Sequence, residues 1–304
     1  MAGRCHGHPP VSLLERSPMA DQLVQDLLEA GIHFGQKKSA WNPKMKSYIW
    51  GERNRIHIID IRSTIRGLLI AKKYITKVVS QGRDVCFVGT KRQARSSIET
   101  HCQETGMPWV TERWLGGTLT NFRTIRERLK RLEELEGLVE SGEIDTYSKK
   151  MTSQLMREKR KITRNLQGIR NMKVHPGAVV IIDSGREVNA LREARNLGIP
   201  TIALIDTDGD PDKVDIPIPG NDDSMRSIDV ILRELSEAVN EGLKRRGTQN
   251  DEQAPAEDVP KTSKRRSSRS SFRAEEKAPE APAETPAEAP AAPAPVAEST
   301  PEQA

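Results

Sequence analysis

The hydrophobic residues of this 304-residue chain follow two patterns that alternate along the sequence. Short, almost uninterrupted apolar runs are typical of strands buried on both faces, and they cover residues 84–89, 178–183 and 201–206. Longer stretches with apolar residues at helical spacing, each closed by a glycine, cover residues 61–79, 91–104 and 187–197. Strands that alternate with helices in this way form a parallel sheet with helices on both faces. The pattern therefore predicts an α/β fold.

Weaker signals extend this pattern. Residues 108–111 predict a short strand. Residues 214–218 predict an edge strand, because the prolines there cannot donate ladder hydrogen bonds in the centre of a sheet. Asp21 is a candidate N-cap for a helix that ends at Gly31. Residues 224–245 have helical spacing and predict a closing helix.

A helical segment interrupts the alternation. Residues 121–142 and 149–172 both predict long helices with apolar residues seven positions apart. These residues are Ile125, Leu132 and Val139 in the first helix and Leu155, Ile162 and Ile169 in the second. Two such stripes joined by a short turn predict an antiparallel coiled-coil hairpin, inserted as residues 121–172. The α/β domain would then comprise residues 19–120 and 173–247.

The two ends of the chain differ in composition from the rest. Residues 248–304 contain 13 Ala, 9 Pro and 9 Glu but no Leu or Ile. Such a segment buries too little apolar surface to offset its ordering entropy, so we expect a disordered tail. Residues 1–18 lack periodicity and predict an unstructured leader. Because the helical pattern begins just after Met19, we expect translation to start there.

The distribution of charged residues along the chain indicates which kind of molecule it binds. The formal net charge is +5, but residues 36–66 hold 8 bases and 2 acids, and residues 149–173 hold 9 bases and one acid. Residues 178–242 reverse the sign, with 14 acids and 6 bases. This clustering favours nucleic acid on one side of the molecule over a set of solvated helix faces. We expect the acidic stretch to face solvent or a protein, since RNA would repel it.

Length and cysteine usage bear on the compartment. No apolar run approaches the length of a membrane span, so we expect no membrane partner. The three cysteines are far apart and odd in number. They do not predict a disulfide framework, and a reducing cytoplasm fits them best.

Motifs for catalysis and cofactor binding are incomplete. Gly89-Thr90-Lys91 follows a strand and opens a helix, but the other residues of a phosphate-binding loop are missing. The acidic run that begins at Asp206 has Pro211 and Pro217 where a calcium loop needs glycine and glutamate. The histidines have no metal-ligand spacing. We therefore expect no enzyme activity, no cofactor, no metal and no small-molecule substrate.

Two segments combine cations with aromatic rings. Cations neutralise phosphates, and flat rings stack on exposed bases, so the combination predicts RNA binding. One segment is the basic arm at residues 37–55, whose tryptophans could alternatively anchor the arm to the domain. The other surrounds the hairpin. The candidate RNA-binding residues are Lys37, Lys38, Trp41, Asn42, Lys44, Lys46, Arg53, Lys91, Arg92, Arg113, Trp114, Asn121, Arg123, Arg157, Arg160 and Arg164.

Several strings of residues resemble the bacterial small-subunit ribosomal protein uS2 family. They are LEAGIHFG at 28–35, WNPKM at 41–45, GERN at 51–54, IHIID at 56–60, FVGTK at 87–91, RWLGGTLTNF at 113–122, GIP at 198–200, DPD at 210–212 and IPGNDD at 218–223. The resemblance covers about residues 19–247. Gln36 departs from it, standing where a second histidine is usual, and Ser184-Gly185 replaces the usual proline and its neighbour.

The resemblance implies a flavodoxin-like parallel sheet that carries a helical hairpin. It also implies a structural role in the cytoplasm, on the small ribosomal subunit, between its head and body. The implied partners are small-subunit rRNA and other small-subunit proteins, including the large multi-OB-fold protein that handles mRNA.

Two other functions stay open at this point. The first is a free, non-ribosomal RNA chaperone with a disordered tail, which cosedimentation with small subunits would distinguish from a structural protein. The second is a nucleotide-binding enzyme on a doubly wound fold, which rests on fold analogy alone.

Overall fold

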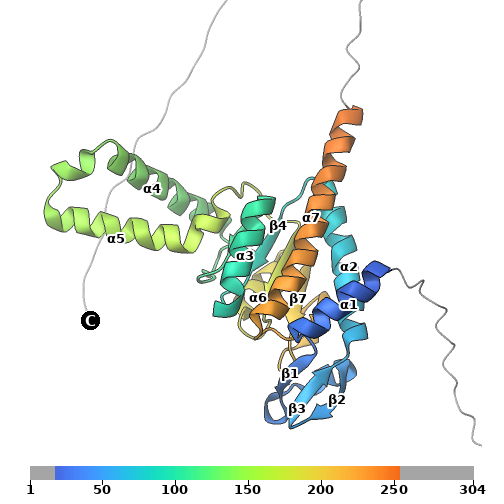
Figure 1. Cartoon of the computed structure of the whole chain (residues 1–304). Helices are drawn as coiled ribbons and strands as arrows, with labels where there is room; N and C mark the ends of the chain where they lie inside the picture. The colour runs from blue at the N-terminus through green and yellow to red at the C-terminus, as the bar shows by residue number, and fades with distance from the viewer. Residues whose placement is uncertain (1–17, 254–304) are drawn as a thin grey trace, which may run out of the picture. The chain divides into compact units, whose positions relative to one another are not determined.

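The computed structural model describes residues 18–253 of the chain. Five parallel strands form its central sheet, in the spatial order β5-β4-β6-β7-β8 (Figure 1). They are β4 (Val85–Val88), β5 (Trp109–Val110), β6 (Ala178–Ile182), β7 (Thr201–Ile205) and β8 (Ile216–Pro219). The predicted parallel α/β sheet is thus confirmed. The proline-containing strand β8 lies at an edge, as its missing N–H donors require.

Side chains of the central strands alternate between two hydrophobic cores. Val85 and Phe87 of β4 point to one face, and Cys86 and Val88 point to the other. All residues of β4, β6 and β7 are buried. Both faces are therefore covered, which is why these strands are continuous apolar runs in the sequence.

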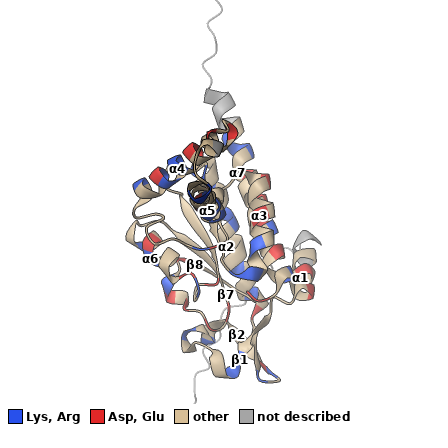
Figure 2. Ribbon diagram, turned by 90° about the vertical axis from the view of Figure 1, so that its left-hand side faces the viewer, with Lys and Arg blue, Asp and Glu red and all other residues tan. Residues whose placement is uncertain are grey.

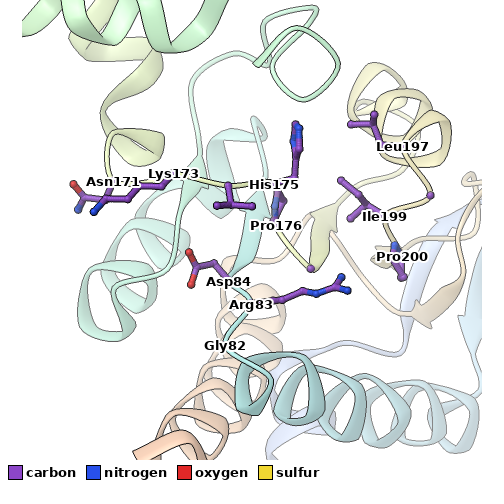
Figure 3. Close-up of a pocket in the computed structure, with 13 residues that line it drawn as sticks. Gly82, Arg83, Asp84, Asn171, Lys173, His175, Pro176, Leu197, Ile199 and Pro200 are labelled. Atoms are coloured by element: carbon purple, nitrogen blue, oxygen red, sulfur yellow. The ribbon is translucent and has the colours of Figure 1, made fainter. Parts of the chain in front are cut away.

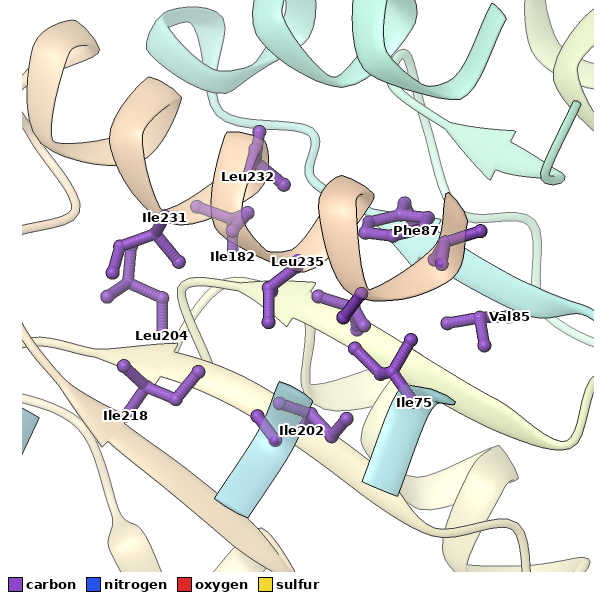
Figure 4. Packing of buried hydrophobic residues seen from close by; sticks show 14 of the residues in the cluster. Ile75, Val85, Phe87, Ile182, Ile202, Leu204, Ile218, Ile231, Leu232 and Leu235 are labelled. Carbon is purple, nitrogen blue, oxygen red and sulfur yellow. The ribbon is translucent and has the colours of Figure 1, made fainter. Parts of the chain in front are cut away.

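Helices cover the two faces unequally. The first face is covered by α2 (Ile61–Ser80), α3 (Arg92–Thr105) and α7 (Met225–Gln253), whose buried residues share one core with the sheet. Figure 4 shows Ile75 of α2 and Leu235 of α7 packed over this face. The second face is covered by α6 (Val188–Asn196) and the base of the helical hairpin. Helix α1 (Pro18–Ala30) packs against α7.

Two predicted boundaries are wrong. Helix α1 already includes Pro18, so Asp21 lies inside the helix and is not its N-cap. Helix α7 runs to Gln253, six residues beyond the boundary at Gly247. The next proline is Pro255, and a proline disfavours helical backbone in the residue before it. The leader at 1–17 and the tail beyond Gln253 lie outside the described residues.

The predicted hairpin helices are α4 (Phe122–Glu140) and α5 (Lys149–Leu166), which lie side by side in Figure 1. The 3-10 turn Glu143–Thr146 follows α4. Their apolar stripe is divided between two cores. Leu135, Ile144 and Leu155 form a small core of their own. Ile125, Leu129, Leu166 and Ile169 join the core under the sheet. Whether the helices supercoil stays a prediction.

Helix α5 ends earlier than predicted, at Leu166, and the chain continues as the 3-10 turn Gln167–Ile169. The reason lies in a tertiary contact. A Cβ atom at Gly168 would overlap the carbonyl oxygen of Trp109 in β5. The glycine therefore lets the hairpin backbone cross directly over the edge strand.

The basic arm folds into a second, antiparallel sheet that the sequence did not predict. It consists of β1 (Phe34–Lys37), β2 (Ile49–Arg53) and β3 (Ile56–Ile59), in the order β1-β3-β2. Two 3-10 turns, Lys38–Ala40 and Pro43–Tyr48, connect β1 to β2. The strands are only four or five residues long, too short to show a clear two-residue periodicity in the sequence.

Within residues 18–253, no helix is both long and apolar enough to cross a membrane.

Candidate nucleic-acid interface

The outer face of α5 carries cations without acidic partners. Arg157, Arg160 and Lys161 are exposed, and none of them has an ion pair with a described residue. They lie opposite the buried Leu155 and Leu166, as helical spacing requires. The only acid of this helix, Glu158, is turned toward Arg131 of α4, with 3.8 Å between Oε1 and Nε. This face is therefore a strip of uncompensated positive charge.

Arg164 belongs to the same strip but is tethered. Its Nη2 lies 2.6 Å from Oε2 of Glu112, and Nη1 of Arg95 lies 3.0 Å from the other oxygen of that carboxylate. The hydrogen bond from Arg164 holds the pKa of Glu112 below its usual value. Two arginines thus share one carboxylate, and this cluster keeps a net positive charge.

The loop that precedes α4 is held by a buried carboxylate. Glu193 of α6 accepts hydrogen bonds from the backbone N–H of Gly117 at 2.8 Å, Leu119 at 2.9 Å and Thr120 at 3.2 Å. Burial raises the pKa of Glu193, but these hydrogen bonds outweigh it and leave the pKa lowered. The carboxylate is therefore charged at neutral pH and fixes the start of the hairpin.

This arrangement corrects the predicted role of Trp114. Its side chain is 6% exposed, and its indole Nε1 donates to Glu193 at 3.1 Å. A buried ring cannot stack on a base, so Trp114 positions the loop instead.

Three other predicted residues of this region are exposed. Arg113 is open to solvent. Arg123 is 92% exposed and, among residues 18–253, pairs only with Glu127 one helical turn away, at 3.4 Å. Asn121 is exposed and accepts a hydrogen bond from Thr124 Oγ1 at 2.9 Å.

The small sheet and the 3-10 turn before β2 carry exposed cations. Lys37, Lys46 and Arg53 are exposed and have no ion pair with any residue of the described chain. Asn54 and Arg55 form the turn between β2 and β3, with φ of 52° and 62°. Trp50 is 76% exposed near the other end of β2. Rings and cations are thus available together on this sheet.

The remaining predicted residues of the arm make internal contacts. Lys38 pairs with Glu52 at 2.8 Å. Lys44 pairs with Asp212 at 2.7 Å and Asp210 at 3.1 Å, and these carboxylates raise its pKa. The ring of Trp41 packs on His57, with centroids 5.2 Å apart.

Asn42 caps the following 3-10 turn through a hydrogen bond from Lys44 N and donates its own N–H to Thr207. Asn42 and Lys44 therefore tie the arm to the loop after β7, whereas Lys38 and Trp41 make contacts within the small sheet. That tryptophans anchor the arm to the domain stays a prediction.

Lys91 is removed from the interface by its own contacts. Its ammonium lies 2.8 Å from Asp222 Oδ1 and 2.7 Å from Asp223 Oδ1, at the carboxyl edge of the parallel sheet. Only 12% of its side chain is exposed, so it cannot meet a phosphate. Its neighbour Arg92 is exposed and without an ion pair among residues 18–253.

The same edge is the one place where carboxylates gather closely enough for a metal among the described residues. Oxygen atoms of Asp206, Asp222 and Asp223 lie within 4.8 Å of one another. The Lys91 ammonium and the Gln36 amide already donate to this group, Gln36 Nε2 to Asp223 Oδ2 at 2.7 Å. Burial raises the pKa of Asp206 to about 6 and that of Asp222 to about 7. The lysine thus supplies the positive charge that a metal would bring.

The acidic stretch is divided between the surface and the interior, so the expectation that it faces solvent or a protein stays a prediction. Seven of its acids are exposed, namely Asp208, Asp212, Asp215, Asp223, Asp229, Glu237 and Glu241. Five of its acids are buried, namely Glu187, Glu193, Asp206, Asp222 and Glu234. They bind backbone N–H groups, hydroxyls or lysines inside the domain; Glu187, for example, accepts from the N–H and hydroxyl of Thr90. Blue and red segments are accordingly interspersed over the ribbon in Figure 2.

Several exposed cations are not among the residues predicted from sequence. They are Lys149, Lys150 and Lys161 of α5, with Arg83 and Lys173 at the opposite edge of the sheet. The helical spacing of the first two with Arg157 was a usable signal. Nothing in the local sequence distinguishes Arg83 or Lys173.

The sequence of this chain matches a known protein family over the region that carries these surfaces. The family model for Ribosomal protein S2 matches residues 27–242, which include both sheets and the hairpin. This chain belongs to the ribosomal protein S2 family. Within that family, it is 56% identical to "Small ribosomal subunit protein uS2" of Rhodopirellula baltica over 237 residues, covering 78% of this chain and 90% of the relative.

Other S2 relatives show comparable coverage. The protein of the same description from Syntrophobacter fumaroxidans is 48% identical, covering 75% of this chain and 83% of the relative. That from Campylobacter concisus is 45% identical, covering 79% and 92%. The S2 family resemblance of the sequence is thus confirmed.

Proposed function

We propose that this chain is a structural constituent of the small ribosomal subunit that binds small-subunit rRNA and supports translation. The family membership supports the place on the small subunit. The observation that carries rRNA binding is the outer face of α5, where Arg157, Arg160 and Lys161 have no acidic partners within the described chain. Clustered, unpaired cations bind phosphates and not specific bases, so most contacts would be to the RNA backbone.

The finer location and partners are part of the same proposal. The chain would lie in the cytoplasm, between the head and the body of the subunit, with its flavodoxin-like strand order and its coiled-coil hairpin directed to rRNA. It would also contact other small-subunit proteins, including the large multi-OB-fold protein that handles mRNA. Exposed Leu69 and Ile70 on α2 support a protein contact, since they are 47% and 50% exposed on a helix that carries no candidate RNA residue.

The rRNA contact is tested by salt dependence. Replacing Arg157 and Arg160 by Ala should weaken binding to small-subunit rRNA. It should also flatten the slope of log affinity against log salt by roughly 0.9 per lost contact on a duplex site. The control replaces Arg131 and Arg170, which pair with Glu134 and Glu136 at 2.9 and 2.7 Å. An unchanged slope in the first variant would show that the α5 face is merely solvated.

The ribosomal place is tested separately by cosedimentation. A structural constituent should stay with small subunits through a moderate-salt gradient, whereas a free RNA chaperone should dissociate. The enzyme alternative predicts a micromolar site for ATP, GTP or flavin mononucleotide in calorimetry, and the proposed structural role predicts none.

A further inference from the structure

A hollow opens at the amino-terminal edge of the parallel sheet, the edge opposite Lys91. Three segments line it: the turn at residues 82–84 after α2, residues 171–177 after the hairpin, and the turn at residues 197–200 before β7 (Figure 3). Its volume is about 530 Å³, within the range of roughly 300–1,000 Å³ that ligand pockets occupy. The segments come from distant parts of the sequence, so only the fold creates this hollow.

Cations without partners surround the hollow. Arg83 and Lys173 are exposed, and neither has an ion pair with residues 18–253; His175, also in the lining, is exposed too. Arg246 of α7 approaches the same turn, its guanidinium 3.8 Å from the position a Cβ would take at Gly82. Asp84 is the one carboxylate in the lining. The hollow therefore attracts anions, and phosphate matches its donors.

Apolar surface lies between these cations. Val174 is 73% exposed and Leu197 is 42% exposed, although both are aliphatic. The ring of His175 packs on Phe122 at the start of the hairpin, with centroids 5.2 Å apart. A nucleobase has two apolar faces, which are covered in a duplex and free in an unpaired nucleotide. Exposed aliphatic groups next to unpaired cations thus fit an unpaired nucleotide.

The hollow is joined to the proposed RNA surface. Arg126 of α4 donates from Nη1 to the carbonyl oxygen of Lys173 at 3.3 Å. This bond fixes the hollow's rim against the base of the hairpin whose α5 face carries the unpaired arginines. An RNA that lies on the hairpin base can therefore reach the hollow without leaving the protein.

We propose that this hollow binds one unpaired nucleotide of the small-subunit rRNA. Arg83 and Lys173 hold its phosphates, and Val174 and Leu197 contact its base. The inference rests on the proposed function, which it extends from phosphate contacts on the hairpin to a nucleotide-sized site. The hollow is open and its contacts are few, so a free mononucleotide gains too little to bind tightly.

The first experiment measures affinity and salt dependence with the full chain and small-subunit rRNA. The variant Arg83→Ala/Lys173→Ala should bind more weakly, and its slope of log affinity against log salt should flatten by roughly 0.7 per lost contact on a single strand. The control is Arg192→Ala/Arg226→Ala, which removes the same charge from exposed arginines of α6 and α7 that lie outside the hollow. Both pairs are exposed, so both variants should fold.

The second experiment locates the nucleotide. In a Cys5→Ser background, Val174→Cys carries a benzophenone probe, and Met225→Cys is the matched control at another exposed site, 57% exposed. Cys86 and Cys102 are buried; burial raises the pKa of Cys86 to about 12 and also raises that of Cys102, so neither thiol reacts. The probe at position 174 should crosslink an unpaired rRNA nucleotide, and the probe at position 225 should not.

The outcomes separate this inference from the proposed function. If Arg157→Ala/Arg160→Ala weakens binding while Arg83→Ala/Lys173→Ala leaves affinity and slope unchanged, the hollow is no RNA site and the hairpin interface stands. Crosslinks only to paired nucleotides, or only to protein, would equally overturn the hollow as a nucleotide site. If the unaltered chain fails to bind small-subunit rRNA at all, the proposed function itself fails.

Discussion

Arg55 stands in a backbone conformation that arginine rarely adopts. It and Asn54 are the two residues of the turn between β2 and β3, both with positive φ. A two-residue turn of this kind is normally made by Asn-Gly, because the left-handed conformation costs a residue with a Cβ about 1–2 kcal/mol. Arg55 is exposed at the tip of this turn, and its carbonyl oxygen accepts a hydrogen bond from the N–H of Lys38, the neighbour of the candidate RNA-binding residue Lys37. Backbone strain of this kind is often retained for function.

The variant Arg55→Gly should therefore raise the free energy of unfolding by about 0.5–1 kcal/mol, because glycine adopts this φ freely. The same variant should weaken binding to rRNA. Urea unfolding and filter binding measure the two effects. The control Asn54→Gly alters the same turn without removing a cation, and should leave RNA affinity unchanged. Equal RNA affinity for Arg55→Gly and the unaltered chain would show that the arginine has no RNA contact.

Glu193 illustrates a residue whose importance only the structure reveals. Its carboxylate satisfies three backbone N–H groups and the indole of Trp114. In sequence it is one of many acids in the stretch from 178 to 242. Its role could not be predicted, because the donors come from a loop more than seventy residues earlier.

Replacing Glu193 by Gln should lower the free energy of unfolding by about 2–3 kcal/mol, because the amide presents only one acceptor oxygen and turns a donor toward N–H groups. The pKa of Glu193 is lowered in the folded chain, so its contribution is present at neutral pH and lost as pH falls through the folded pKa. The difference between the two chains should shrink in acid. Arg192→Ala, an exposed neighbour, should leave stability nearly unchanged.

At the scale of elements, the carboxyl edge of the sheet combines strands β4, β7 and β8 into one charge cluster. Lys91 follows β4, Asp206 follows β7, and Asp222 follows β8. The parallel strands were predictable from their apolar runs, and parallel strands place their carboxyl ends together. The pairing of Lys91 with Asp222 could not be predicted, because the loops that follow the strands decide where these side chains point.

This cluster has a testable pH dependence. Burial raises the pKa of Asp222 from 3.8 to about 7 in the folded chain, so the folded state binds the proton more tightly. The contribution of this group to stability therefore falls as pH rises from about 4 to about 7. Asp222→Asn cannot titrate. In urea titrations, the free energy of unfolding of the unaltered chain relative to this variant should decline between about pH 4 and pH 7. A difference that stays constant with pH would contradict the raised pKa of Asp222.

The hairpin shows how tertiary packing divides a regular sequence pattern. The seven-residue spacing correctly predicted two helices. It could not show that Ile125 and Ile169 pack under the sheet while Leu135 and Leu155 pack on each other. The spacing is the same in both parts, and only proximity to the sheet differs.

At the scale of the whole molecule, helix α7 is the last element of the described residues. It continues to Gln253, and Leu243 packs against the main core. A chain that ends at Gln253 should therefore unfold with the stability of the full chain and cosediment with small subunits. A chain that ends at Glu241 removes Leu243 and should lose about 1–2 kcal/mol of stability. If the chain ending at Gln253 failed to enter subunits, residues beyond it would be needed for docking.

The sequence by itself determined the α/β class, the order of strands and helices in the parallel-sheet domain, the helices of the hairpin and the family, because each depends on local periodicity or on strings of adjacent residues. The tertiary structure alone decided which charges remain free. Lys91, Lys44 and five acids of the 178–242 stretch have partners supplied by other segments, whereas Arg157 and Arg160 have none among the described residues. A count of charged residues in the sequence treats every ionisable group equally, but only the groups that folding leaves unpaired are available to bind RNA.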